Sequence, residues 1–389
     1  MISAAQSAPD QVGGGTHIPS FRPTPNPAST PEMALLLAAC ARTAPGTGAI
    51  GHLVRQPIDW SVLLSLAQHH GVTPLLCRTA ACCTGLFPRE ILSVLHCRFQ
   101  ETARANLMRL GELARVLDTL TAGKISVIPF KGPNLGCYVY GDVALREFSD
   151  LDVLIRPNDL PAAKKLLLEA GYSPEFRLSA AQEARYLRSA CELNFTHRTL
   201  GILLELHWQV LSRQFSLEFD LDQLWARARD VQIGPCQALS LSPEDLLLIL
   251  SAHAAKHLWA RLLWTADIAE LLSVTPGIDW DYAFSEARRI GAARILSITL
   301  LMADALFRVG PPSQIHRRLE HDRLAFRIAS SLSQKVLSAP VEETSRVTSH
   351  LTLLLARERW RDRSRYASRT LLASARTRAF GSMHSPLSS

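Results

Sequence analysis

Residues 131–155 read KGPNLGCYVYGDVALREFSDLDVLI and join two apolar runs of the chain. The segment begins with Lys131-Gly132 and ends in a short aliphatic run that carries Asp150 and Asp152. Such a run, closed by a proline, is typical of a β-strand. Alternate residues of a strand face the same side, so the two carboxylates should project together, about 6.6 Å apart along the chain.

The sequence around this segment alternates between strand and helix patterns. We expect strands at 124–130 and 150–155, a helix at 159–172, and a hairpin formed by 191–197 and 201–210. Strands separated by a helix indicate an α/β unit, here of roughly 90 residues.

The remainder of the chain is predominantly helical by periodicity. We therefore expect an α+β fold in which a small mixed β-sheet is flanked by an N-terminal and a C-terminal helical lobe. The expected parts are a disordered leader rich in Pro, Gly, Ser and Thr, a helical N-terminal subdomain, the α/β core, a helical C-terminal lobe, and a basic amphipathic helix with a flexible tail: 1–31, 32–122, 123–235, 236–338 and 339–389.

Composition narrows the class of protein. Of 389 residues, 47% are hydrophobic and 20% are charged, which is typical of a soluble globular chain. The net charge of +7 favours anionic partners, either a nucleoside triphosphate or RNA, although much of the excess comes from the C-terminal segment. No apolar run reaches the roughly 18 residues of a membrane span, and the first residues lack a secretory signal pattern. We expect a cytoplasmic protein without a membrane partner.

Cysteine and histidine spacing gives no indication of zinc. The eight cysteines form no paired C-x-x-C set, so reduced thiols are expected. His253 and His257 lie four residues apart, but HAAKH lacks the glutamate of the H-E-x-x-H helix, which favours a structural or pocket-lining role. We expect Trp259, Trp264 and Trp280 to pack in the core of the helical lobe.

Three acidic residues suit a divalent cation. Asp150 and Asp152 on one strand face offer oxygen ligands, which Mg²⁺ and Mn²⁺ prefer. Glu205 lies in the apolar run LLELHW, where an unpaired buried charge would be costly. We expect all three carboxylates to converge on neighbouring strands of one sheet.

Two basic residues suit phosphate. Gly132 permits a sharp turn and a close approach of the backbone, and Lys131 supplies a point charge. Arg146 is placed to add a second cation, although it is equally compatible with a surface ion pair to Glu147 or Asp142.

Five ordered segments together resemble the uncharacterised nucleotidyltransferase family, a branch of the DNA polymerase β-like superfamily. The resemblance spans about residues 33–310 and rests on AQHHGVTPLL (67–76), KG (131–132), REFSDLD (146–152), ELHW (205–208) and the set His253, Lys256, His257, Leu263, Trp264 and Asp267.

The resemblance implies transfer of a nucleoside monophosphate from an NTP such as ATP to an acceptor hydroxyl, with Mg²⁺ or Mn²⁺ as cofactor and pyrophosphate released. It implies that Asp150, Asp152 and Glu205 are catalytic and hold the metal. The residues that it implies for nucleotide contact are Lys131, Gly132, Arg146, Ser149 and His207.

Two alternatives stay open from the sequence. One is a catalytically inactive nucleotide-binding or antitoxin-like interaction module. The other is an RNA-modifying nucleotidyltransferase, although RNA is not specifically indicated. The acceptor itself, whether small molecule, peptide or protein, is not identified by any motif.

Overall fold

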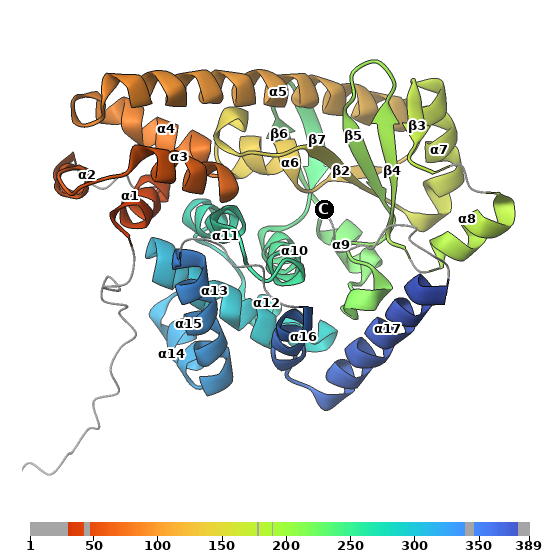
Figure 1. Cartoon of the computed structure of the whole chain (residues 1–389). Helices are drawn as coiled ribbons and strands as arrows, with labels where there is room; N and C mark the ends of the chain where they lie inside the picture. The colour runs from red at the N-terminus through yellow and green to blue at the C-terminus, as the bar shows by residue number, and fades with distance from the viewer. Residues whose placement is uncertain (1–29, 43–46, 177–178, 189, 339–345, 380–389) are drawn as a thin grey trace, which may run out of the picture.

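The computed structural model describes residues 30–42, 47–176, 179–188, 190–338 and 346–379. Over these residues it confirms the predicted class, because the chain is mostly helical and contains a mixed five-stranded sheet and a two-stranded sheet. Helices surround the region that holds the sheets (Figure 1). The predicted leader, apart from Thr30 and Pro31, lies outside the described residues, as do 339–345 and 380–389.

Short helices form the first part of the described chain. Their buried side chains belong to the same apolar cluster as those of the C-terminal helices, and α1 contacts α13. The two helical lobes therefore share one core. The elements are α1 (Pro31–Cys40), α2 (Thr47–Val54), α3 (Trp60–His69), α4 (Thr73–Cys82) and the 3-10 turn η1 (Thr84–Leu86).

Helix α5 (Arg89–Ala122) links that core to the sheet. Its 34 residues give a length of about 51 Å, and it runs along one side of the molecule (Figure 1). Leu95 near its beginning belongs to the core of the lobes, whereas Leu113 and Leu117 pack in a second cluster with the sheet. One long helix thus fixes the position of the sheet relative to the helical lobes.

The main sheet has the strand order β1-β2-β5-β4-β3. Strands β2 and β5 are parallel, and the other neighbours are antiparallel. The predicted strand at 150–155 and the predicted hairpin are confirmed, whereas the strand expected at 124–130 is shorter and β3 was not expected. The bounds are β1 (Val127–Pro129), β2 (Asp150–Ile155), β3 (Tyr172–Pro174), β4 (Glu192–His197) and β5 (Leu203–His207).

Short helices and turns connect these strands. The helix expected at 159–172 is shorter in the structure, because the chain enters β3 directly after Gly171. The connecting elements are α6 (Gly132–Asn134), the π-helical turn η2 (Leu135–Val139), η3 (Val143–Leu145), η4 (Pro157–Asp159), α7 (Leu160–Glu169), α8 (Ala180–Leu187) and η5 (Arg213–Phe215).

Strand β2 is buried on both faces. Leu151, Val153 and Ile155 pack on the side that α5 covers. Leu154 belongs to the core of the helical lobes, so Asp150 and Asp152, which share its side of the strand, face that core. Two carboxylates on an otherwise apolar face need nearby positive charge.

The C-terminal part begins with a strand where helix was expected. Residues from 236 were predicted to be helical, but Cys236–Ser240 form β7, which pairs with β6 (Arg229–Ile233) around Gly234 at φ +55°. Glycine readily adopts this left-handed conformation, so the hairpin forms. The helices that follow are α10 (Pro243–Lys256), α11 (Leu262–Val274), α12 (Trp280–Ile290), α13 (Ala293–Phe307), α14 (Ser313–Glu320), α15 (Arg323–Leu337), α16 (Arg346–Leu355) and α17 (Trp360–Ala379), with α9 (Leu221–Arg227) before β6.

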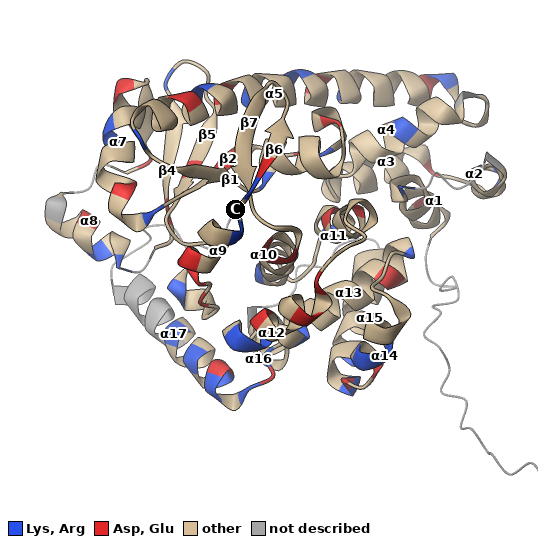
Figure 2. Ribbon diagram, turned by 180° about the vertical axis from the view of Figure 1, so that it is seen from behind, with Lys and Arg blue, Asp and Glu red and all other residues tan. Residues whose placement is uncertain are grey.

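Charge is distributed over the whole molecule. Figure 2 shows acidic and basic segments interspersed among the helices, with basic residues recurring along α17. The C-terminal helices therefore carry part of the positive excess that the composition shows, as the sequence predicts.

A buried ion pair joins the segment before β2 to the C-terminal lobe. Arg146 donates two hydrogen bonds to Asp267 of α11, at 2.8 and 2.9 Å, and the Tyr140 hydroxyl donates a third at 2.8 Å. Arg146 is 5% exposed and Asp267 is 1% exposed. The strong desolvation of both charges makes each partner dependent on the other.

Replacing Asp267 by Asn should destabilise the protein by about 3–5 kcal/mol, because the uncompensated Arg146 cation stays buried. Urea-induced unfolding followed by circular dichroism measures this loss. The matched control is Asp222→Asn, which removes an ion pair to Arg156 whose carboxylate side chain is 93% exposed. Its effect should stay below about 0.5 kcal/mol. Similar losses in the two variants would contradict a structural role for the buried pair.

Candidate active site

Strands β2 and β5 bring distant acidic residues together. In their parallel pairing, Asp152 lies beside Glu205 and Leu154 lies beside His207. Paired residues of neighbouring strands project to the same face of a sheet. Ligand atoms of Asp152, Glu205 and His207 consequently lie within 4.8 Å of one another, although Asp152 and His207 are 55 residues apart in the sequence.

Asp152 is the more deeply buried of the paired acids. Its side chain is 1% exposed, compared with 18% for Glu205. Its Oδ1 lies 2.5 Å from Lys131 Nζ and 3.1 Å from His207 Nε2. Burial alone would raise the pKa of Asp152, but the positive charges of Lys131 and His207 hold it well below its usual range. The carboxylate is therefore ionised.

Asp150 stands at the edge of this arrangement. It is half-buried, and burial together with the neighbouring Asp152 carboxylate raises its pKa to about 6. Among the described residues, it is not part of the group within 4.8 Å, where His207 is the third member instead. The structure thus places Asp150 beside Asp152 on the same strand face but further from Glu205.

The Lys131-Gly132 turn lies against β2. Gly132 has a φ of +47°, and a Cβ atom built there would lie 3.1 Å from the backbone oxygen of Asp150, so the position favours glycine. Burial alone would lower the pKa of Lys131, but Asp152, Glu205 and Asp150 together raise it. Lys131 therefore keeps its positive charge inside the protein.

His207 is held between acidic groups on both sides of its ring. Its Nε2 lies 3.3 Å from Glu205, and its Nδ1 lies 3.3 Å from Glu192 of β4. Burial alone would lower the pKa of His207, but hydrogen bonds to Asp152 and Cys191 and the Glu192 charge raise it well above its usual value. The imidazole is only 2% exposed, so it contacts neighbouring side chains and not solvent.

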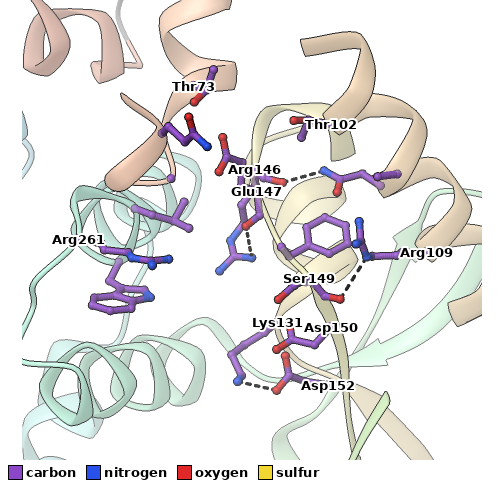
Figure 3. Close-up of a pocket in the computed structure, with 18 of the residues that line it drawn as sticks. Thr73, Thr102, Arg109, Lys131, Arg146, Glu147, Ser149, Asp150, Asp152 and Arg261 are labelled. Atoms are coloured by element: carbon purple, nitrogen blue, oxygen red, sulfur yellow. Dashed lines mark hydrogen bonds and ion pairs between the residues drawn. The ribbon is translucent and has the colours of Figure 1, made fainter. Parts of the chain in front are cut away.

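Asp150 and Asp152 open onto a pocket of about 700 Å³. Figure 3 shows that Lys131, Asp150 and Asp152 lie at one end of it, with Ser149 beside them. Among the predicted site residues, Lys131, Gly132, Arg146, Ser149, Asp150 and Asp152 line the pocket, whereas Glu205 and His207 are not in its lining.

Arg146 and Ser149 reach the pocket from the segment before β2. The alternative interpretation, a surface ion pair of Arg146 with Glu147 or Asp142, is wrong, because its side chain binds Asp267 in the interior. Ser149 is exposed, and its backbone oxygen accepts a hydrogen bond from Arg109 Nε at 3.2 Å. Arg146 therefore contributes its charge from a fixed position.

The rest of the pocket comes from residues that the motifs did not identify. Arg98 of α5 lines the pocket. Thr102 and Arg109 also project from α5, and Arg261 comes from the loop between α10 and α11 (Figure 3). The spacing of the α5 residues places them along one side of the helix. The sequence contained that spacing, but it did not show which side of the helix faces the acids.

Two histidines and a tryptophan form another wall of the pocket. The His257 ring stacks on Trp264 with centroids 4.8 Å apart, and His253 lies beside both. Burial and the nearby Lys256 lower the pKa of His257 to about 3, and burial likewise lowers that of His253. Both imidazoles are therefore neutral, and both line the pocket. Trp264 also lines the pocket and does not pack solely in the core.

A family comparison identifies the chain. The model of the uncharacterised nucleotidyltransferase family matches residues 56–308. The chain belongs to this family. The resemblance inferred from the five motifs is thereby confirmed, and the matched range includes the site residues described above. No curated protein and no solved structure matches the chain.

The oxygen donors of this family member are of the type that a hard divalent cation takes. Asp150, Asp152 and Glu205 offer oxygen ligands, and Lys131 and His207 supply positive charge at the same point. Separately, within the described part of the chain, no helix combines the length and apolar character of a membrane span.

Replacing Gly132 by Ala should destabilise this family member more than Gly201→Ala does. Gly132 and Gly201 both have positive φ, +47° and +65°, so each substitution incurs the left-handed cost of about 1–2 kcal/mol. A Cβ at 132 also meets the Asp150 backbone oxygen, whereas nothing lies within 4 Å of one at 201. The additional loss should be at least about 1 kcal/mol in urea unfolding. Equal losses would mean that the turn does not press against β2.

Proposed function

We propose that this protein is a metal-dependent nucleotidyltransferase that moves a nucleoside monophosphate from an NTP, such as ATP, to an acceptor hydroxyl. Pyrophosphate is the second product. One observation carries the proposal: in a member of a nucleotidyltransferase family, Asp152 is paired with Glu205 across two strands and contacts Lys131 at the end of a pocket. Membership in the family supports the class of reaction. The strand pairing supports the assignment of Asp152 and Glu205 to the site.

In this proposal Asp150, Asp152 and Glu205 hold Mg²⁺ or Mn²⁺. Such an ion, when bound, neutralises the triphosphate and stabilises charge on its phosphoryl oxygens. The backbone pairing of β2 with β5 presents the oxygens of Asp152 and Glu205 together before any ligand arrives. This preorganisation is what electrostatic catalysis requires of a protein.

Lys131, Gly132, Arg146 and Ser149 orient the triphosphate in this proposal. Lys131 is charged and lines the pocket, with 14% of its side chain exposed. Gly132 permits the left-handed turn that follows Lys131, and it lines the pocket beside that lysine. Arg146 lines the pocket from a position that its ion pair with Asp267 fixes.

Glu205 is our candidate for the group that accepts the proton of the acceptor hydroxyl. Its side chain is more exposed than that of Asp152 and lies 3.3 Å from His207 Nε2. The imidazole N–H can steady the carboxylate in one orientation. His207 therefore acts through Glu205 and Asp152, and a direct nucleotide contact is not part of the proposal.

The acceptor binds in the remaining part of the pocket. The arginines of α5 and the α10–α11 loop, Arg98, Arg109 and Arg261, make that part suitable for a ligand with an anionic group. A small molecule, a peptide and a protein segment are all compatible with a pocket of this size, and RNA is the alternative acceptor.

Replacing Asp152 by Asn should lower transfer by at least about 100-fold, because the amide keeps the shape but removes the charge that binds cations. The assay incubates the protein with each labelled NTP, Mg²⁺ or Mn²⁺ and a cell extract, and then identifies the labelled product. Asp150→Asn should behave alike, and the double variant should be scarcely worse, since the pair works as a unit. Circular dichroism confirms folding.

The matched control is Glu169→Gln, which removes an acid that is 61% exposed on α7. It should transfer at the wild-type rate. If Asp152→Asn also did so with Mg²⁺ present, the catalytic assignment would fail, and a nucleotide-binding interaction module would become the better description.

Replacing Lys131 by Ala should raise KM for the NTP more than it lowers kcat, because the lost charge mainly grips the triphosphate. Steady-state rates at varied NTP concentration separate the two effects. Lys165→Ala, which changes a lysine with a 77% exposed side chain on α7, serves as the control and should alter neither constant. A large loss of kcat at unchanged KM would instead assign Lys131 to the chemical step.

A further inference from the structure

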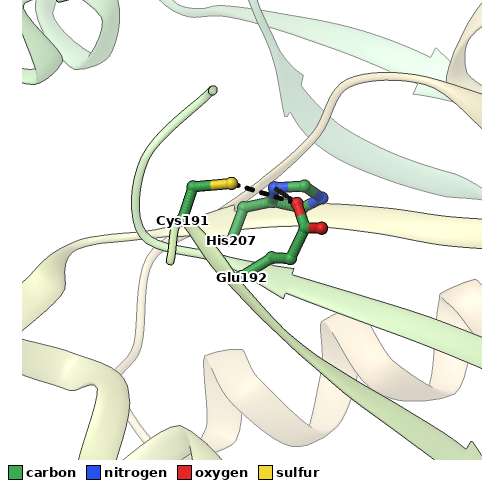
Figure 4. A group of neighbouring side chains, drawn as sticks. All are labelled: Cys191, Glu192 and His207. Carbon is green, nitrogen blue, oxygen red and sulfur yellow. Dashed lines mark hydrogen bonds and ion pairs between the residues drawn. The ribbon is translucent and has the colours of Figure 1, made fainter. Parts of the chain in front are cut away.

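A second group of ligand-forming side chains lies on the other side of His207. Ligand atoms of Cys191, Glu192 and His207 all lie within 4.8 Å of one another, and Figure 4 shows the three side chains converging. Cys191 Sγ lies 3.2 Å from Glu192 Oε2, and His207 Nδ1 lies 3.3 Å from the same oxygen. The proposed reaction uses neither Cys191 nor Glu192.

Backbone pairing holds this group together. Glu192 and His207 are direct partners in the antiparallel β4–β5 ladder. The Trp208 N–H donates a hydrogen bond to the Cys191 carbonyl at 2.9 Å. The three side chains are therefore brought together by the sheet itself and need no ligand to approach one another.

The nitrogen of His207 that faces Cys191 and Glu192 is Nδ1. Nδ1 is buried and forms no hydrogen bond, although Glu192 and Cys191 lie close to it. A buried polar atom without a hydrogen bond is unfavourable in a folded protein. The other ring nitrogen, Nε2, already faces Asp152 and Glu205. The arrangement points Nδ1 between the three side chains, where a bound cation would take the place of its proton.

We propose that Cys191, Glu192 and His207 bind Zn²⁺. Thiolate, carboxylate and imidazole are the ligands that zinc takes in proteins, whereas Mg²⁺ prefers oxygen alone. Bond lengths of about 2.0–2.3 Å place tetrahedral zinc ligands about 3.4 to 3.6 Å apart. The separations of 3.2 and 3.3 Å are close to these values. The Glu192 side chain is 27% exposed, which leaves a fourth position for water.

Zinc at this place would connect to the acids through one ring. Binding forms zinc–sulfur and zinc–nitrogen bonds and releases two protons to solvent, one from the Cys191 thiol and one from Nδ1 of the charged His207. With the metal on Nδ1, the remaining proton of His207 sits on Nε2 and points toward Asp152 and Glu205, the usual link between a zinc ligand and neighbouring carboxylates. This positioning effect rests on the proposed function, whereas the zinc site itself does not.

The competing explanation is an ordinary polar cluster. In it, Cys191 stays a thiol that donates to Glu192, and a charged His207 sits between the carboxylates without any metal. The two explanations differ in whether a thiolate–metal bond forms, which is directly visible by spectroscopy.

Cobalt titration of the full-length chain tests the proposal. The protein is purified under reducing conditions, stripped with a chelator and titrated with Co²⁺. We expect one equivalent to give a thiolate-to-cobalt charge-transfer band and the strong visible bands of tetrahedral cobalt, both abolished by added Zn²⁺. Cys191→Ser should remove the charge-transfer band and weaken Zn²⁺ binding more than about 100-fold, because a direct ligand contributes more than the outer groups whose loss costs about 10–100-fold.

Matched variants identify the site. Cys97→Ser, which changes an exposed thiol on α5, should keep the full spectrum. Glu192→Gln should weaken binding while retaining the charge-transfer band, which also tests the site if Cys191→Ser does not fold. Asp150→Asn should stop transfer but leave the spectrum intact, so failure of the reaction and failure of the zinc site are distinguishable. Absence of the band in the wild type, or its persistence in Cys191→Ser, overturns the proposal.

Discussion

The parallel pairing of β2 with β5 is the constraint on which the site depends. Its register sets Asp152 beside Glu205 and places His207 two residues further along the same face. Side chains alternate along a strand, so a shift of one residue would turn Glu205 and His207 toward α5 and bring leucines to the acids. The apolar residues on the opposite face, among them Leu151 and Leu204, oppose such a shift because it would expose them to the charged side.

Charge balance then determines how these residues can stay buried. Asp152 is stabilised by Lys131 and His207, and His207 is in turn stabilised by Glu205 and Glu192. The same principle operates at Arg146 and Asp267, which neutralise each other between the sheet and α11. These pairs form a connected set of alternating charges, so removing one member leaves its partner buried and uncompensated. The charges of the candidate site and those of the structural ion pairs thus depend on neighbouring charges in the same way.

The pocket exists because separate parts of the chain meet over the acids. Helix α5 extends from the helical core to the sheet, and its side chains Arg98 and Arg109 line the pocket at two points along its length. The α10–α11 loop supplies the opposite wall. Leu258 and Trp259 in this loop adopt positive φ angles of 56° and 50°. Trp259 is fully buried and donates a hydrogen bond to Thr299, which offsets the conformational cost and fixes the loop.

The sequence by itself determined the fold class, the family and the β2 strand, because local periodicity and ordered motifs record such features directly. It also singled out Lys131, Gly132, Asp150, Asp152 and Glu205 as candidate site residues. Only the tertiary structure decided that Arg146 pairs with Asp267, that α5 lines the pocket, and that Cys191 and Glu192 meet His207. The hairpin of β6 and β7 also escaped prediction. The physical reason is that these outcomes depend on strand register and on which helix face is buried, and both are set by contacts between residues far apart in the chain.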